Sequence, residues 1–148
     1  MENISRKIRR LVTYYTRLCG SRDPVAIAQF AGIGIHICPL GDIAGNYMLL
    51  KRKRWILIND SIDKDSPFFR VVVAHELGHA LLHRTENCAF IKRHTLLLTS
   101  GIEREANMFA AELLIDNGLA SECQTIGQIR DYTGYPEDLI MLKVKKHI

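Results

Sequence analysis

This chain of 148 residues lacks several features that would assign it to other classes of protein. No apolar run approaches the ~18 residues of a membrane-spanning helix, so we expect no contact with a membrane. Charged residues interrupt the apolar positions of the opening MENISRKIRRLV, so no signal peptide is expected. Cys-x-x-Cys pairs are also missing. We therefore interpret the four cysteines as reduced thiols and expect a cytoplasmic protein.

Aromatic residues make up only 7% of the chain, and the net charge is only +4. This charge is too small to indicate nucleic-acid binding by itself. The chain is 47% hydrophobic and 24% charged, which is typical of a globular domain and excludes a disordered or collagen-like chain. No repeat, low-complexity tract or linker divides the sequence. We therefore expect one domain over residues 1–148.

Apolar periodicity and capping residues predict a mainly helical α+β domain with a small three-stranded sheet. Gly20 should end the first helix, whereas Asp23-Pro24 and Ser66-Pro67 should begin later ones. A charged turn, Lys51-Arg52-Lys53-Arg54, is interpreted as a solvated hairpin loop, with contact to nucleic acid or an acidic partner as the alternative. We expect helices over 4–18, 24–31, 67–83, 101–115, 126–132 and 136–146, and strands over 33–37, 45–50 and 55–58. The last two helices should form a C-terminal pair at about 124–147.

The most informative segment is His75-Glu76-Leu77-Gly78-His79, which lies in a strongly apolar helical pattern. Residues four apart share one helix face, so the two imidazoles can converge on one Zn²⁺. Glu76 is one position along, where its carboxylate can reach a water on the metal without being a ligand. Burying two unpaired histidines is costly, which disfavours a purely structural role. The pattern is typical of a zinc hydrolase.

A catalytic zinc site needs a third protein ligand and one position open to water. The downstream helix offers Glu103, Glu105 and Glu112. Glu103 and Asn107 share a face, whereas Glu105 points about 160° away from Glu103. We therefore select Glu103 as the ligand and Asn107 as an acceptor for the N–H of a coordinating histidine. The alternative is a capping box with Ser100, in which Glu103 only bonds the N-cap amide.

His83 continues the spacing of His75 and His79 along the same helix. Eight residues span about 12 Å of a straight helix, which is too far for His75 and His83 to share one ion easily. We therefore interpret His83 as a packing residue or as a neighbour of the ligands.

HELGHALLH followed by EREANMFAAELLI resembles the ImmA/IrrE family of small metallopeptidases, which often accompany mobile elements. The resemblance is densest over residues 56–115 and covers the rest of the chain more loosely. It implies a minimal zincin-like fold and one zinc ion per chain, bound by His75, His79 and Glu103. In this family and its zincin relatives, a strand beside the active helix can pair with extended substrate. The similar strand in this sequence is WILIN, and its candidate substrate-binding residues are Ile56, Ile58 and Asn59.

The resemblance also implies a substrate class, because relatives cleave or help to remove helix-turn-helix repressors. We therefore expect a zinc-dependent endopeptidase acting on such a repressor of a prophage, mobile element or stress response. Glu76 would accept a proton from the attacking water and return it to the departing amine. No oxyanion donor is identified, although Tyr47, His94 and Tyr132 are candidates.

Two other functions remain as alternatives. A DNA-binding regulator would explain the RKIRR run, the KRKR turn and the helix-turn-helix-like tail. The last helix is mostly apolar, so we expect it to dock on the core and do not expect direct nucleic-acid binding. A metal- or redox-sensing protein without proteolytic activity is the second alternative. The presence of Glu76 between the two histidines disfavours it.

Overall fold

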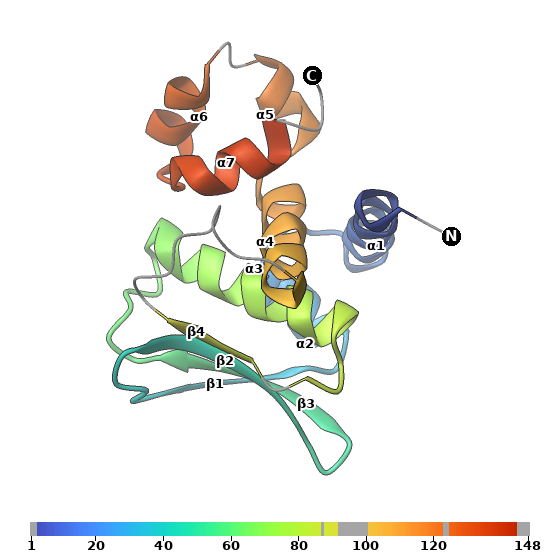
Figure 1. Ribbon diagram of the computed structural model, residues 1–148, viewed down its shortest axis with the longest axis vertical. Coiled ribbons are helices and arrows are strands. Elements are labelled where there is room, and N and C mark those ends of the chain that lie inside the picture. The colour runs from blue at the N-terminus through green and yellow to red at the C-terminus, as the bar shows by residue number, and fades with distance from the viewer. Residues whose placement is uncertain (1–2, 87, 92–100, 123–124, 145–148) are drawn as a thin grey trace.

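The computed structural model describes residues 3–86, 88–91, 101–122 and 125–144. Across these residues the chain forms seven helices and four strands (Figure 1). The helices are α1 (Ile4–Cys19), α2 (Pro24–Phe30), α3 (Pro67–Leu82), α4 (Gly101–Leu114), α5 (Asn117–Glu122), α6 (Ile126–Thr133) and α7 (Glu137–Val144). The strands are β1 (Gly34–Cys38), β2 (Ile43–Leu50), β3 (Lys53–Asn59) and β4 (Cys88–Ile91). None of the helices in the described part combines the length and apolar character needed to cross a membrane.

The four strands form one mixed sheet in the order β1-β3-β2-β4. β3 pairs with β1 in parallel and with β2 in the antiparallel sense, and β4 pairs antiparallel with the other side of β2. The predicted α+β class with a small sheet is confirmed. β4 was not anticipated and extends the sheet beyond the three expected strands.

Local capping explains where several helices begin and end. Asp23 accepts a hydrogen bond from the backbone N–H of Val25 at the start of α2, and Ser66 accepts one from Phe69 at the start of α3. Gly20 adopts a left-handed conformation, φ 75°, directly after α1. These three caps were predicted, and each is confirmed.

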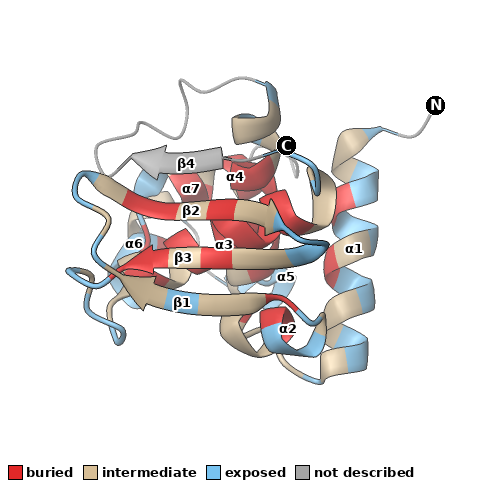
Figure 2. Ribbon diagram, turned by 90° about the horizontal axis from the view of Figure 1, so that it is seen from below, coloured by how far each residue is buried: buried red, intermediate tan, exposed pale blue. Residues whose placement is uncertain are grey.

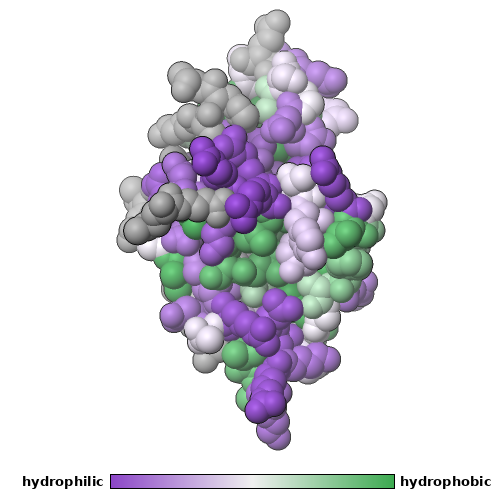
Figure 3. Space-filling view, turned by 90° about the vertical axis from the view of Figure 1, so that its right-hand side faces the viewer, coloured by the Kyte–Doolittle hydropathy of each residue, from purple (hydrophilic) through white to green (hydrophobic). Residues whose placement is uncertain are grey.

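The turn between β2 and β3 is shorter than the charged tetrapeptide suggested. Only Lys51 and Arg52 form the turn, with φ of 51° and 68°, and the segment makes a hydrophilic tip at the lower end of the molecule (Figure 3). Arg54 belongs to β3, and its guanidinium donates to the carbonyls of Ala80 and Ala31 at 3.2 and 3.0 Å. The prediction of a solvated loop is therefore wrong for Arg54, because its charge satisfies carbonyls at the ends of α3 and α2.

α3 packs on one face of the sheet and is covered on its other side by α4. The opposite face of the sheet carries no helix of the described residues (Figure 2). α1 and α7 pack against α4, and α2 lies against β1 and α3 (Figure 1). α3 is therefore the central helix, and most of its residues are buried. The predicted docking of the last helix on the core is confirmed, since Leu139, Ile140 and Leu142 are buried.

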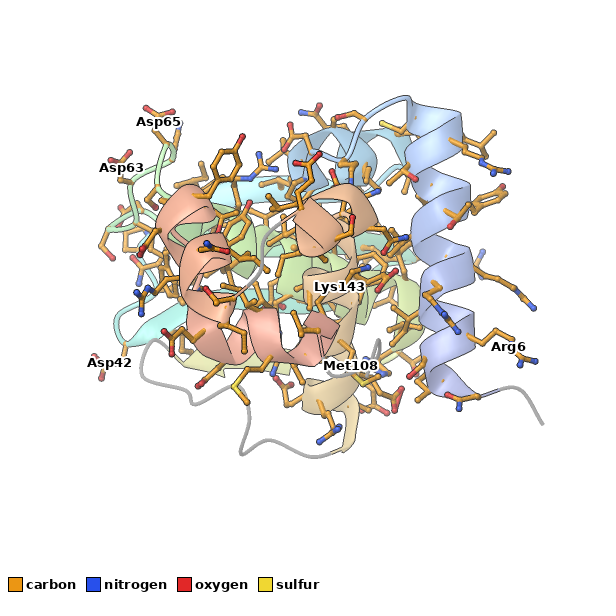
Figure 4. All side chains as sticks on the ribbon, turned by 90° about the horizontal axis from the view of Figure 1, so that it is seen from above. Arg6, Asp42, Asp63, Asp65, Met108 and Lys143 are labelled. Carbon is orange, nitrogen blue, oxygen red and sulfur yellow. The ribbon has the colours of Figure 1, made fainter. Side chains whose placement is uncertain are left out.

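A buried ion pair fixes the C-terminal helices to α4. The Lys143 ammonium of α7 lies 2.9 Å from Glu112 Oε2 and donates to Asn117 Oδ1 at 2.7 Å. Its side chain is 1% exposed. Figure 4 shows Lys143 in the interior, whereas Arg6 points outward from α1. The pair joins α4, α5 and α7 at one point.

Candidate metal centre

Glycines allow the central helix to approach its neighbours closely. A Cβ on Gly45 of β2 would lie 2.6 Å from Val72 Cγ1 and 3.2 Å from Glu76 Cγ, so a side chain there would collide with α3. A Cβ on Gly78 would lie 3.1 Å from the Cα and the carbonyl oxygen of Ala106 on α4. These two contacts set the spacing of β2, α3 and α4, and with it the position of the residues between them.

Two arginines anchor the C-terminal ends of the two helices that carry the site. Arg54 donates to the Ala80 carbonyl near the end of α3. Arg22 donates to the carbonyls of Leu113 and Glu112 near the end of α4, at 3.1 and 2.9 Å. Terminal carbonyls of a helix have no partner within the helix, so these bonds satisfy them and fix both helices.

His75, His79 and Glu103 converge between α3 and α4. Nε2 of His75 lies 3.1 Å from Glu103 Oε2, Nε2 of His79 lies 3.0 Å from Glu103 Oε1, and the two Nε2 atoms are 3.2 Å apart. The three potential ligand atoms all lie within 4.8 Å of one another, an arrangement that could hold a metal ion. Both imidazoles are buried, and the Glu103 side chain is 25% exposed. Of these three side chains, the carboxylate is therefore the one in contact with solvent.

Asn107 lies beside this group, as the shared helix face with Glu103 predicted. Its Oδ1 is 2.6 Å from His75 Nδ1. An amide oxygen can only accept, so His75 donates from Nδ1 and keeps a lone pair on Nε2, the atom that faces Glu103. The capping-box alternative for Glu103 involves Ser100, which lies outside the described residues. In the structure Glu103 pairs with both histidines.

Glu76 is fully buried next to the histidines, and neither of its carboxylate oxygens has a hydrogen-bond partner among the described residues. Burial raises its pKa well above the ordinary value of 4.5, and the charge of Glu103 raises it further, while the Tyr47 backbone opposes the rise. An unpaired buried carboxylate costs stability, so its presence indicates a chemical role.

The pKa values of His79 and Glu103 are both lowered, but by different causes. Burial lowers the pKa of His79, and the charge of His75 adds to this effect, although Glu103 opposes it. For Glu103, burial alone would raise the pKa. The adjacent His75 and His79 side chains outweigh that effect and hold its pKa well below 4.5. These two shifts favour a neutral imidazole at His79 and an ionised carboxylate at Glu103, which are the forms that bind metals.

The candidate substrate-binding strand is placed differently from the prediction. β3 is flanked by β1 and β2, so it has no free edge for strand addition. Ile56 and Ile58 are fully buried, and the Asn59 amide donates to the carbonyls of Gly41 and Ile43. The expectation that extended substrate pairs with this strand is wrong, because the described edges of the sheet are β1 and β4.

Neither described candidate for the oxyanion donor is suited to that role. Tyr47 donates its hydroxyl to the Arg84 carbonyl at 2.6 Å. Tyr132 is 79% exposed on α6. His94 lies outside the described residues. No oxyanion donor is therefore assigned among the residues that the structure describes.

Sequence reasoning missed one residue near the site. Glu105 was set aside because it points away from Glu103 around α4, yet its Oε1 lies 3.1 Å from His83 Nε2. Nδ1 of His83 is in turn 3.0 Å from Nδ1 of His79. The spacing 75, 79, 83 was the available signal, and it indicated a neighbour of the ligands but no partner on α4.

Comparison with known proteins decides the family. The family model described as the IrrE N-terminal-like domain, peptidase family M78, matches residues 28–131. This chain belongs to the ImmA/IrrE family. As a family member, it is similar to the uncharacterized immunity region protein 2 of Bacillus phage phi105, with 33% identity over 147 residues, 95% of this chain and 88% of the relative. It is also similar to the metallopeptidase ImmA of Bacillus subtilis (strain 168), with 27% identity over 118 residues, 80% of this chain and 69% of the relative.

The ImmA/IrrE assignment agrees with the geometry. The family is one of metallopeptidases, and the group formed by His75, His79 and Glu103 fits a metal cofactor. The resemblance inferred from HELGHALLH and EREANMFAAELLI is confirmed, and His75, His79 and Glu103, which lie in these two segments, converge.

Proposed function

We propose that this chain is a zinc-dependent endopeptidase with one zinc ion, held by His75, His79 and Glu103. Atoms about 2.0–2.1 Å from a tetrahedral zinc ion are about 3.3 Å apart. The corresponding pairs in this chain are 3.0 to 3.2 Å apart. Two imidazoles and one carboxylate are also a ligand set typical of catalytic zinc. This convergence, next to an unpaired buried carboxylate, is the observation that carries the proposal.

Three protein ligands leave one position for water or substrate. Among the described residues, no further His, Cys, Asp or Glu joins the group. A structural zinc site is closed by a fourth protein ligand, whereas a catalytic one keeps the fourth position open. The donor set therefore supports a catalytic site.

Glu76 is the proposed general base. When bound there, zinc would supply a Lewis acid for the peptide carbonyl and for water. The Glu76 carboxylate accepts the proton of the attacking water and then gives it to the departing amine. Its raised pKa supports this role, because the carboxylate is then a stronger base than an exposed glutamate.

The proposed substrate is a helix-turn-helix transcriptional repressor of a mobile element or stress response. The resemblance to ImmA/IrrE proteins supports this, and so does similarity to a protein named for a phage immunity region. We further infer a cytoplasmic location, because a transcriptional repressor of this kind is present in the cytoplasm. Free thiols at Cys19 and Cys38 agree with a reducing compartment.

The decisive test is Glu76→Gln, assayed with a helix-turn-helix repressor encoded beside this gene. We expect the variant to keep about one zinc per chain and to lose cleavage, because the amide removes only the base. Glu86→Gln is the matched control, since Glu86 is exposed and lies outside the site. Undiminished cleavage by Glu76→Gln would refute the mechanism.

The ligand assignment has its own measurement. His75→Ala, His79→Ala and Glu103→Ala should each lower the zinc content of the purified protein, measured by elemental analysis. Full zinc occupancy in Glu103→Ala would show that this carboxylate is not a ligand.

A further inference from the structure

His83 and Glu105 form a second layer behind the proposed ligand His79. The His83 side chain is 7% exposed and follows the last turn of α3, and Glu105 is on α4. Their contacts run in series, from Glu105 Oε1 to His83 Nε2 at 3.1 Å and from His83 Nδ1 to His79 Nδ1 at 3.0 Å. Both distances are within hydrogen-bonding range.

The chemistry of these atoms gives the series one direction. A carboxylate can only accept, so His83 donates from Nε2 to Glu105. A neutral imidazole has a single N–H, which leaves Nδ1 of His83 as an acceptor. His79 must then donate from its Nδ1. Its lone pair is therefore on Nε2, the atom that faces His75 and Glu103.

The two ligand histidines thus have equivalent arrangements built from different residues. Asn107 Oδ1 accepts a hydrogen bond from Nδ1 of His75 at 2.6 Å. An amide oxygen can accept a hydrogen bond but cannot donate one. The imidazole of His83 could either donate or accept, so it needs Glu105 to fix its own proton. Asn107 therefore fixes the tautomer of His75 by its own chemistry, whereas His83 can do the same for His79 only together with Glu105.

We propose that His83 and Glu105 are positioning residues, which together hold His79 in the tautomer that presents Nε2 to the metal. The inference rests on the proposed zinc site and adds two residues that do not touch the ion. Glu105 acts only through His83. Hydrogen bonds of this kind orient a ligand and raise its basicity, and losing one typically weakens metal affinity about 10–100-fold.

The test is zinc affinity, measured by competition with a chromophoric chelator on the full chain. His83→Leu removes the acceptor and should weaken zinc binding about 10–100-fold. His83→Asn places an amide oxygen near the position of Nδ1, as Asn107 does for His75, and should restore most of the loss. His36→Leu is the control, because His36 is exposed on β1. Thermal unfolding of each variant reports whether it is folded.

Glu105→Ala distinguishes positioning from packing. In the wild-type background it should weaken zinc affinity about tenfold or less, since His83 remains but its proton is no longer fixed. In the His83→Leu and His83→Asn backgrounds the same substitution should leave zinc affinity unchanged, because Glu105 acts on His79 only through the His83 imidazole. If the effects of Glu105→Ala and of the His83 substitutions on the free energy of zinc binding are additive in the double variants, Glu105 does not act through His83 and the proposal is wrong.

A spectroscopic readout is independent of affinity. In the zinc-loaded wild type, nitrogen-15 NMR should show a scalar coupling across the hydrogen bond between the two Nδ1 atoms of His79 and His83. Absence of the coupling, or zinc affinity unchanged in folded His83→Leu, would overturn the inference. A wild type that binds no zinc would overturn the proposed function as well. Zinc binding without peptide cleavage would overturn only the endopeptidase, and the affinity series would still decide the roles of His83 and Glu105.

Discussion

Glu76 is the residue at which stability and chemistry oppose each other. Its carboxylate is fully buried against the backbone of β2 at Gly45, with no hydrogen-bond partner for either oxygen among the described residues. A group of this kind costs about 1–3 kcal/mol of folding free energy. Replacing it should therefore stabilise the protein while removing the proposed base.

We predict that Glu76→Gln raises the unfolding free energy of the metal-free protein by about 1–3 kcal/mol at neutral pH, because the amide is unpaired as well but carries no charge to bury. The folded-state pKa of Glu76 is raised above 4.5, so the wild type loses stability as the pH rises through and above 4.5. Below that pH both states hold the proton, and the advantage of the variant should disappear. Urea unfolding at several pH values measures the difference. A gain that is equal at acidic and neutral pH would show that the buried charge of Glu76 is not its cause.

Individual residues also show how far the sequence could predict the site. Helix periodicity correctly placed Glu103 and Asn107 on the face that meets the histidines. The same argument set Glu105 aside, because a 160° difference in direction was taken to exclude it. α4 packs along α3, so side chains from a wide arc of α4 can reach different turns of α3. Which side chains of α4 reach α3 depends on how the two helices pack, and the periodicity of a single helix does not predict that packing.

At the scale of elements, the site depends on how closely α4 approaches α3. Gly78 is the point of contact, where an added Cβ would meet the Ala106 backbone and Phe109 Cβ, each at 3.1 Å. Displacing the backbone of α4 would cost stability, because α1 and α7 pack on it from other sides. Glu103 is one turn before this contact and moves with α4.

We predict that Gly78→Val destabilises the protein by about 1–3 kcal/mol through overpacking and also weakens metal binding. The larger side chain pushes α4 away from α3 and separates Glu103 from both histidines. Gly127→Ala in α6 is the matched control, because an added Cβ there makes only ordinary contacts, the nearest at 3.7 Å. The control should gain up to about 1 kcal/mol from helix propensity. Denaturant unfolding and zinc competition together test the pair, and full zinc affinity in Gly78→Val would show that the site does not depend on this close approach.

The elements themselves were largely predictable where local chemistry determines them. Caps at Asp23, Ser66 and Gly20 depend on neighbouring residues, and their prediction is confirmed. The place of β3 between two strands and the pairing of β4 with β2 depend on partners distant in the chain. No local pattern contains this information, so strand addition was assigned to a strand without a free edge.

At the scale of the whole molecule, the C-terminal helices are joined to the rest by a charge pair within the core. Lys143 is 1% and Glu112 8% exposed, and they lie 2.9 Å apart. Apolar residues of α6 and α7 belong to the same core as those of α3 and α4. Removing one partner leaves the other charge buried and unpaired, which is more costly than removing both.

We predict that Lys143→Met lowers the unfolding free energy by about 3–5 kcal/mol. The double variant Lys143→Met with Glu112→Leu should regain most of this loss, because no buried charge remains. Chemical denaturation of the two variants measures both effects. A double variant as unstable as the single one would show that the pair itself, rather than the unpaired carboxylate, is responsible.

The proposed ion has ligands on both α3 and α4. It would therefore join two helices that are far apart along the chain. In this respect it resembles a removable covalent cross-link, whose effect on stability grows with the loop that it closes. Extraction with a chelator should therefore loosen the two helices unequally. α3 is enclosed by the sheet and α4, whereas the first turn of α4 begins at its more exposed end. We predict that amide hydrogen exchange accelerates first around Glu103 and last around His75, so that loss of the ion is recorded as fraying at one helix end.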